Sequence, residues 1–249
     1  MAEKPGVLVD APSDLAPFVS PPGASEPPDP AAKRLLAIIE SPGTTADRRR
    51  LAILEAESVP FDPADANRLK GFLRSLLDRS YSTKDPDERV AVSSAVRKYV
   101  SLLKPDELAG LAELIRAERK APPTFEMEVA KMVVRKLTAV LPEDTAALAP
   151  LAEELMDVVR AYASPRALVK RYQGAAALDA ALGVTMISAT HTAEVAALIG
   201  GLDAQWFREV VAQRAREIAT ELEGRFPSAR RERAVAALSQ LADAAVKAG

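Results

Sequence analysis

Prolines recur along the chain at positions that favour the starts of helices, and this pattern constrains the fold more than any other feature. Proline lacks a backbone N–H and fixes φ at about −65°, so it fits the first helical position, where that N–H would have no partner. After residue 61, prolines that could occupy such a first helical position occur at Asp62-Pro63, Asp85-Pro86, Lys104-Pro105, Pro122-Pro123, Leu141-Pro142 and Ser164-Pro165. The sequence therefore predicts a helix beginning near each of these prolines.

Between these prolines, apolar residues recur every three or four positions, as they do on the buried face of a helix. Examples are Leu69, Leu73 and Leu76; Val92, Val96, Tyr99 and Leu103; and Leu151, Leu155, Val158 and Tyr162. Further helices are predicted over 31–40, 45–57, 191–199, 204–224 and 228–247. The one β-branched run, at residues 184–187, is short and isolated. These patterns predict an all-α protein.

The proline spacing alternates in a way that suggests paired helices. Pro63 and Pro105 are 42 positions apart, and Pro105 and Pro142 are 37 apart, so a two-helix unit of about forty residues recurs. Helices of similar length joined by short turns pack antiparallel, and stacked pairs bury a continuous core. Over roughly residues 62–182 the chain resembles the HEAT and armadillo-like repeat proteins. The resemblance implies a short α-solenoid; an irregular multi-helix bundle is the alternative.

The first thirty residues differ from the rest of the chain. They hold eight of the nineteen prolines, and five acidic residues against the single Lys4, a net charge of −4. We expect residues 1–30 to form a disordered, proline-rich acidic tail ahead of an all-helical domain over 31–249. Leu15, Phe18 and Val19 are apolar within this tail, and form a candidate motif for docking on a partner or in the protein's own groove. An inert leader is the alternative.

Composition excludes several classes of protein. The chain has no cysteine, so it has neither disulfides nor thiolate metal sites, and no apolar run suits a signal peptide or a membrane span. We therefore expect a cytoplasmic protein that does not insert into membranes. Phosphate-binding and hydrolase motifs are absent, and the lone His191 has only Glu194 close by as a possible co-ligand. No metal or cofactor is predicted, and Trp206 is predicted to lie in the core.

Basic residues form the pattern that depends most on the architecture. If helices alternate between two layers, those near 86–103, 124–141 and 164–182 share a layer, whereas the helix near 143–162 is acidic. The basic residues of the shared layer are Arg97, Lys98, Lys131, Arg135, Lys136, Arg166, Lys170 and Arg171. Such a stripe would suit an acidic peptide or a phosphate backbone. The alternative is that these cations complement helix dipoles and keep the surface hydrated.

Three functions follow as hypotheses. The first is a non-enzymatic scaffold or adaptor that binds a protein partner on its helical surface, because a helical surface without a reactive constellation suits recognition. The second is nucleic-acid binding by the basic layer, and the third an enzyme in which two of Glu126, Glu153, Glu154 and Asp157 converge in a cleft. The alternative for these carboxylates is a hydrated surface. No sequence feature identifies the partner or the oligomeric state.

Overall fold

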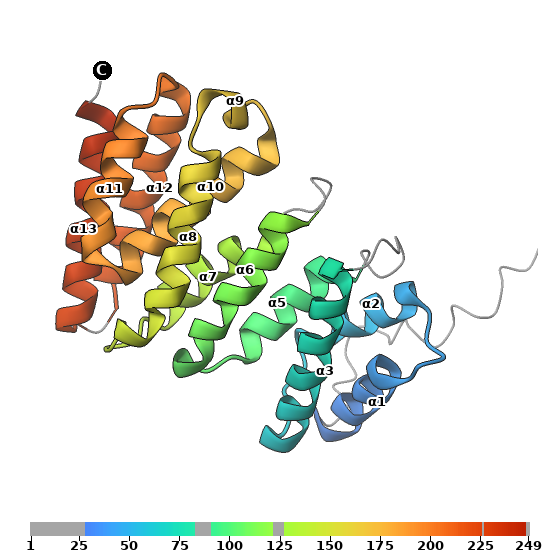
Figure 1. Cartoon of the computed structure of the whole chain (residues 1–249). Helices are drawn as coiled ribbons and strands as arrows, with labels where there is room; N and C mark the ends of the chain where they lie inside the picture. The colour runs from blue at the N-terminus through green and yellow to red at the C-terminus, as the bar shows by residue number, and fades with distance from the viewer. Residues whose placement is uncertain (1–27, 83–90, 122–126, 226, 248–249) are drawn as a thin grey trace, which may run out of the picture.

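The computed structural model of the protein describes residues 28–82, 91–121, 127–225 and 227–247. Figure 1 shows the order of the helices along the chain. They are α1 (Pro28–Glu40), α2 (Ala46–Ala56), α3 (Pro63–Ser82), α5 (Val92–Leu102), the 3-10 helix η2 (Pro105–Gly110), α6 (Leu111–Lys120), α7 (Glu128–Ala139), the 3-10 helix η3 (Ala146–Leu148), α8 (Ala149–Tyr162), α9 (Pro165–Leu168), α10 (Arg171–Ile187), α11 (Ala189–Gly200), α12 (Gln205–Glu223) and α13 (Ala229–Lys247). In the part of the chain described, no residue forms a β-strand, so the all-α prediction is confirmed.

The helices pack as pairs that stack along the molecule. The pairs α3–α5, α6–α7 and α8–α10 are each in contact, and the stack advances from α1 at one end to α13 at the other (Figure 1). In one layer α1, α3, α6 and α8 touch in succession; in the other α2, α5, α7 and α10 do so. At the C-terminal end α13 packs against α10, α11 and α12. The prediction of packed helix pairs is therefore confirmed.

One hydrophobic core runs through all of the pairs. Buried apolar residues form a continuous cluster that extends from Leu35 in α1 to Ala245 in α13. Each fully buried leucine or isoleucine contributes about 1.5–3 kcal/mol relative to an exposed one, so the stack is stabilised mainly by this cluster. At Gly183 the backbone of α10 comes so close to α8 that an added Cβ would lie 3.1 Å from Leu155 Cδ1. The absence of a side chain permits this close packing.

Three of the predicted helix starts are confirmed and one is wrong. Pro63, Pro105 and Pro165 each begin a helix, whereas Pro86 and Pro123 lie outside the described residues. Pro142 begins none: Asp144 Oδ1 accepts a hydrogen bond from the Ala146 amide at 2.8 Å, which favours a turn here. The helix begins at Ala149 instead, with Pro150 in its first turn.

The core prediction for Trp206 is also wrong. On α12 the buried stripe contains Phe207, Val211, Ile218 and Leu222, which recur at helical spacing. Trp206 precedes Phe207 by one position, so it points about 100° away from this stripe and remains 56% exposed.

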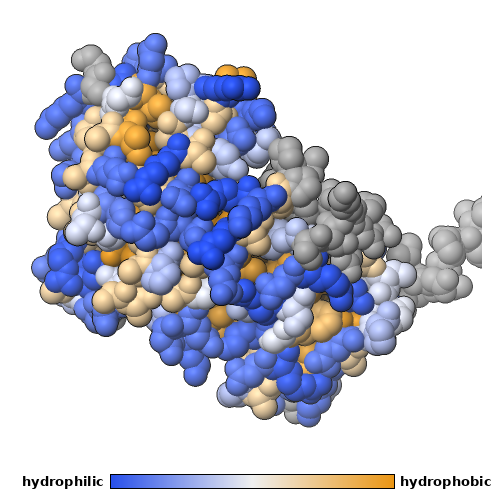
Figure 2. All heavy atoms as spheres, in the orientation of Figure 1, coloured by the Kyte–Doolittle hydropathy of each residue, from blue (hydrophilic) through white to orange (hydrophobic). Residues whose placement is uncertain are grey.

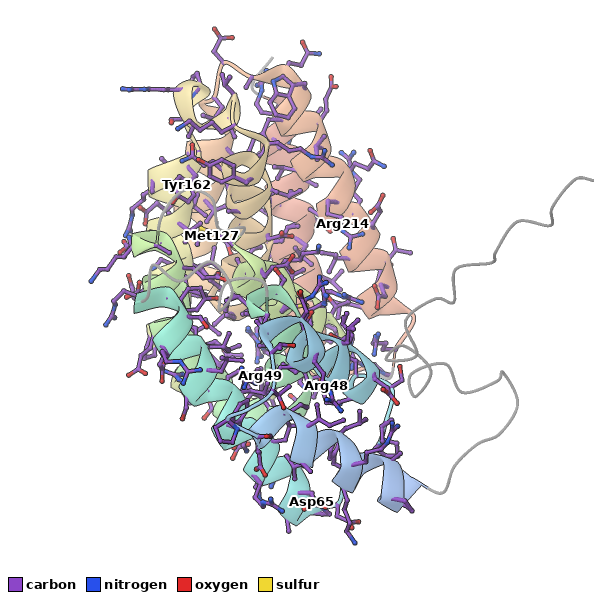
Figure 3. The ribbon with its side chains drawn as sticks, turned by 90° about the vertical axis from the view of Figure 1, so that its right-hand side faces the viewer. Arg48, Arg49, Asp65, Met127, Tyr162 and Arg214 are labelled. Carbon is purple, nitrogen blue, oxygen red and sulfur yellow. The ribbon has the colours of Figure 1, made fainter. Side chains whose placement is uncertain are left out.

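An arginine side chain holds the turn that joins the first two helices. Arg49 of α2, labelled in Figure 3, donates hydrogen bonds of 3.1–3.2 Å to the carbonyls of Ile39, Ser41 and Thr44 at the turn after α1. These carbonyls lie at or beyond the end of α1, where few N–H groups are available to them. The predicted tail residues 1–27 lie outside the described residues, and α1 begins at Pro28. No described helix combines the length and apolarity needed to cross a bilayer.

Candidate functional site

Three of the eight predicted basic residues have roles inside the stack. Arg97 Nε lies 3.4 Å from Glu57 Oε1, and Lys136 donates to the Ser101 carbonyl at 3.0 Å. Lys98 is buried and donates to the Ala56 carbonyl, and burial lowers its pKa. The structure therefore uses these cations to join α5 to α2 and α7 to α5.

The other five form an exposed group on adjacent helices. Each is exposed and forms no hydrogen bond or ion pair with the described residues. These residues are Lys131, Arg135, Arg166, Lys170 and Arg171, on α7, on α9 and at the start of α10. We call them the basic face. Helices α7 and α10 are in contact, so the residues on these two helices belong to neighbouring elements of one layer, as the sequence predicted.

The acidic residues of α8 are arranged differently, because basic residues neutralise them. Glu154 accepts hydrogen bonds from Arg116 at 2.7 Å and from Arg119 at 3.2 Å. Asp157 lies 3.0 Å from Arg119 and 3.2 Å from Arg160. Figure 2 shows the hydrophilic surface that covers α6 and α8. These ion pairs link α6 to α8.

The remaining carboxylates considered for an enzymatic role also have partners or lie elsewhere. Glu153 Oε1 is 3.0 Å from His191 Nε2, and His191 Nδ1 is 2.8 Å from the Ser188 hydroxyl. Glu194 binds Arg160 at 2.9 Å. Glu126 lies outside the described residues. Of the three described carboxylates of α8, Glu154 and Asp157 are held by ion pairs with arginines and Glu153 by its contact with His191, and none of the three lines the cavity described next.

A cavity of about 480 Å³ lies between α7 and α10, beside the basic face. Its lining is Met127, Glu128, Lys131, Arg171, Tyr172, Ala175 and Ala176. Met127 is labelled in Figure 3. The alanines belong to a run of small residues in α10, which begins at Gly174, and their short side chains leave room that longer ones would fill. The cavity therefore has two cations at its wall and apolar side chains around them.

Glu128 is the unusual member of this lining. Only 6% of the residue is exposed, and its Oε2 atom is buried without a hydrogen-bond partner in the described structure. A buried polar atom that lacks a partner destabilises a protein by about 1–3 kcal/mol, and a charged one by more. Nothing in the local sequence pattern indicates that the Glu128 carboxylate is buried.

A second buried carboxylate lies behind Glu128. Glu118, the last acidic residue of α6, accepts hydrogen bonds from the Tyr81 hydroxyl at 2.7 Å and from the Val129 amide at 3.1 Å. Burial raises the pKa of Glu118 to about 8; these two hydrogen bonds lower it, and the charge of Glu128 raises it. The sequence reading missed Glu118, since a glutamate near the end of an amphipathic helix has the pattern of a surface residue.

Asp179 completes the charged groups near the cavity. Burial raises the pKa of Asp179 to about 6, although the charges of Lys131 and Arg214 lower it. Arg214 lies on α12 and is labelled in Figure 3. Among the described residues, no cluster of three or more histidine, aspartate or glutamate side chains is arranged to hold a metal ion. The cavity lining itself carries charges of both signs, in Glu128, Lys131 and Arg171.

Comparison of the chain with protein-family models, with curated proteins and with solved structures finds no match. The site is therefore interpreted from its own geometry and charge.

Proposed function

We propose that the protein is a non-enzymatic scaffold whose basic face binds an acidic segment of a protein partner. One observation carries the proposal: the five cations of the basic face form no ion pair with the described residues, whereas Glu154 and Asp157 of α8 are ion-paired with arginines. Unpaired cations on neighbouring helices attract negative charge from solution and favour association with an acidic surface.

The order of helix contacts supports a repeat-like surface. Each layer places successive helices side by side, as in a short HEAT-like solenoid, so the second layer presents α5, α7 and α10 as one continuous surface. Surfaces of this kind commonly receive extended peptides. The cavity between α7 and α10 lies within this surface and supplies a place for one partner side chain.

An acidic protein segment fits better than a nucleic acid. Nucleic-acid binding proteins combine a strong positive field with aromatic residues on which bases stack. This chain has a formal net charge of −2, and Tyr172, the aromatic residue of the cavity lining, is half-buried.

A binding measurement with a defined probe tests the proposal. A fluorescent peptide of alternating glutamate and serine is titrated with the full chain at low and moderate salt, and a single-stranded oligonucleotide is titrated in parallel. We expect saturable, salt-dependent peptide binding that the double variant Lys131→Glu with Arg135→Glu reduces at least tenfold. The matched control, Arg216→Glu with Lys247→Glu, reverses exposed cations on α12 and α13 and should retain binding.

The outcomes separate the alternatives. Equal loss in both double variants would mean that net charge alone attracts the peptide, and the basic face would not be a specific site. Tight oligonucleotide binding with no peptide binding would favour the nucleic-acid function instead. A crosslinked pull-down with nuclease treatment then identifies the natural partner of whichever class binds.

A further inference from the structure

We infer that the cavity between α7 and α10 is a binding site for a primary ammonium group on an aliphatic stem, with Glu128 as its counter-charge. The inference rests on the proposed function in one respect, because the ammonium group would belong to a lysine of the acidic segment that binds the basic face. A free amino acid carries the same chemistry, and the test below distinguishes these two sources.

The buried carboxylate indicates the charge of the ligand. Glu128 is more than nine-tenths buried, lines the cavity and leaves Oε2 without a hydrogen-bond partner. Its neighbour Glu118 accepts hydrogen bonds from the Tyr81 hydroxyl and the Val129 amide and forms none with Glu128 Oε2. An ammonium group offers three donors and a positive charge, and therefore satisfies a buried carboxylate better than a neutral donor does.

The rest of the lining indicates what else the ligand carries. Lys131 and Arg171 lie at the same cavity without ion-pair partners, so a ligand that brings only a positive charge would be repelled by them. A carboxylate next to the ammonium group would be held by these two cations. Met127, Ala175 and Ala176 provide apolar surface along which the methylene groups of a lysine side chain can pack.

The volume of the cavity agrees with this ligand. At about 480 Å³ it falls within the range of small-molecule pockets, roughly 300–1,000 Å³, and therefore has room for a single side chain and its neighbours. A lysine flanked by acidic residues combines all of the required groups: ammonium for Glu128, methylenes for the apolar wall, and carboxylates for Lys131 and Arg171.

The test compares matched peptides on the full chain. The probes are the glutamate–serine peptide with one central lysine, the same peptide with that lysine acetylated, and free lysine. We expect the lysine peptide to bind about tenfold or more tightly than the acetylated one, because acetylation removes the charge and two of the three donors. Glu128→Gln should abolish this preference, and Glu209→Gln, an exposed carboxylate on α12, should leave it unchanged.

Each result has a defined meaning. Saturable binding of free lysine that depends on Glu128 would support the site and identify a free amino acid as its ligand. Equal binding of the acetylated and unmodified peptides, or a preference that survives Glu128→Gln, would overturn the inference. Acidic-peptide binding that depends on Lys131 and Arg135 but not on the central lysine would leave the proposed function intact while rejecting this site. Circular dichroism and the thermal midpoint confirm that each variant is folded.

Discussion

The substitution Glu118→Gln tests the protonation state of Glu118, the most buried carboxylate among the described residues. Glu118 is 3% exposed, and Tyr81 from α3 and Glu128 from α7 are the titratable groups that face it. Glutamine has nearly the same shape and keeps an oxygen that can accept from the Tyr81 hydroxyl. Its amide nitrogen resembles the protonated oxygen of a neutral carboxyl, so the variant mimics wild-type protein in which Glu118 remains protonated at every pH.

The sign of the effect follows from the pKa. Burial raises the pKa of Glu118 to about 8, above its ordinary value of 4.5, so between these two values the folded state binds more protons than the unfolded state. Stability that depends on this proton is complete below the unfolded pKa and is lost as pH rises through the folded pKa. From pH 6 to pH 8, linkage gives a loss of about 2 kcal/mol of unfolding free energy for wild type relative to the variant.

The assay is urea unfolding of both proteins at pH 5, 6, 7 and 8, followed by circular dichroism. Other titrating groups, Asp179 among them, occur in both proteins, so the difference between the two unfolding free energies isolates Glu118. A decline of about 2 kcal/mol corresponds to a relative shift of about 4–8 °C in the thermal midpoint for a domain of this size. Parallel pH profiles would refute the reasoning and would mean that Glu118 stays ionised in the folded protein.

Four further substitutions test the packing and the hydrogen bonds of the stack. Gly183→Val should destabilise by about 3 kcal/mol in urea unfolding, because the added atoms would overlap Leu155, whereas Gly71→Ala, with open space around it, should stabilise by up to about 1 kcal/mol. The same sign for both would contradict the close approach of α10. Arg49→Met should cost about 3 kcal/mol by removing three hydrogen bonds to carbonyls, and hydrogen exchange should accelerate first in α1 and α2. Lys98→Ala should cost about 2 kcal/mol through loss of its bond to Ala56, with an unchanged unfolding midpoint as the contrary result.

Predictions that rest on local sequence signals held more often in this chain than predictions that depend on tertiary context. The helix start at Pro63 follows from the backbone chemistry of proline, which acts within one or two residues. The start expected at Pro142 was wrong because Asp144 forms a competing turn with the Ala146 amide. The prediction that Trp206 lies in the core was wrong because one helical position separates it from the buried stripe that contains Phe207.

The residues of the candidate site also differ in how far the sequence predicted them. The sequence identified the basic residues of the second layer, but it could not distinguish Lys131, which lies exposed at a cavity, from Lys98, which is buried and bonded to the α2 backbone. Both are lysines on amphipathic helices, and the difference depends on the neighbouring helix. The cavity and its buried Glu128 had no signal in the sequence for the same reason.

The sequence by itself therefore determined the all-α class, the regions where helices form and the difference in charge between successive helices, because proline geometry and apolar periodicity act over a few residues. Only the tertiary structure decided which charges are neutralised and which remain free. The arginines of α6 reach the carboxylates of α8 from about 35–38 positions away in the chain, whereas Arg135 of α7 and Arg171 of α10 form no ion pair with the described residues. Electrostatic pairing depends on distances of a few ångströms in space, and those distances exist only once the helices are stacked.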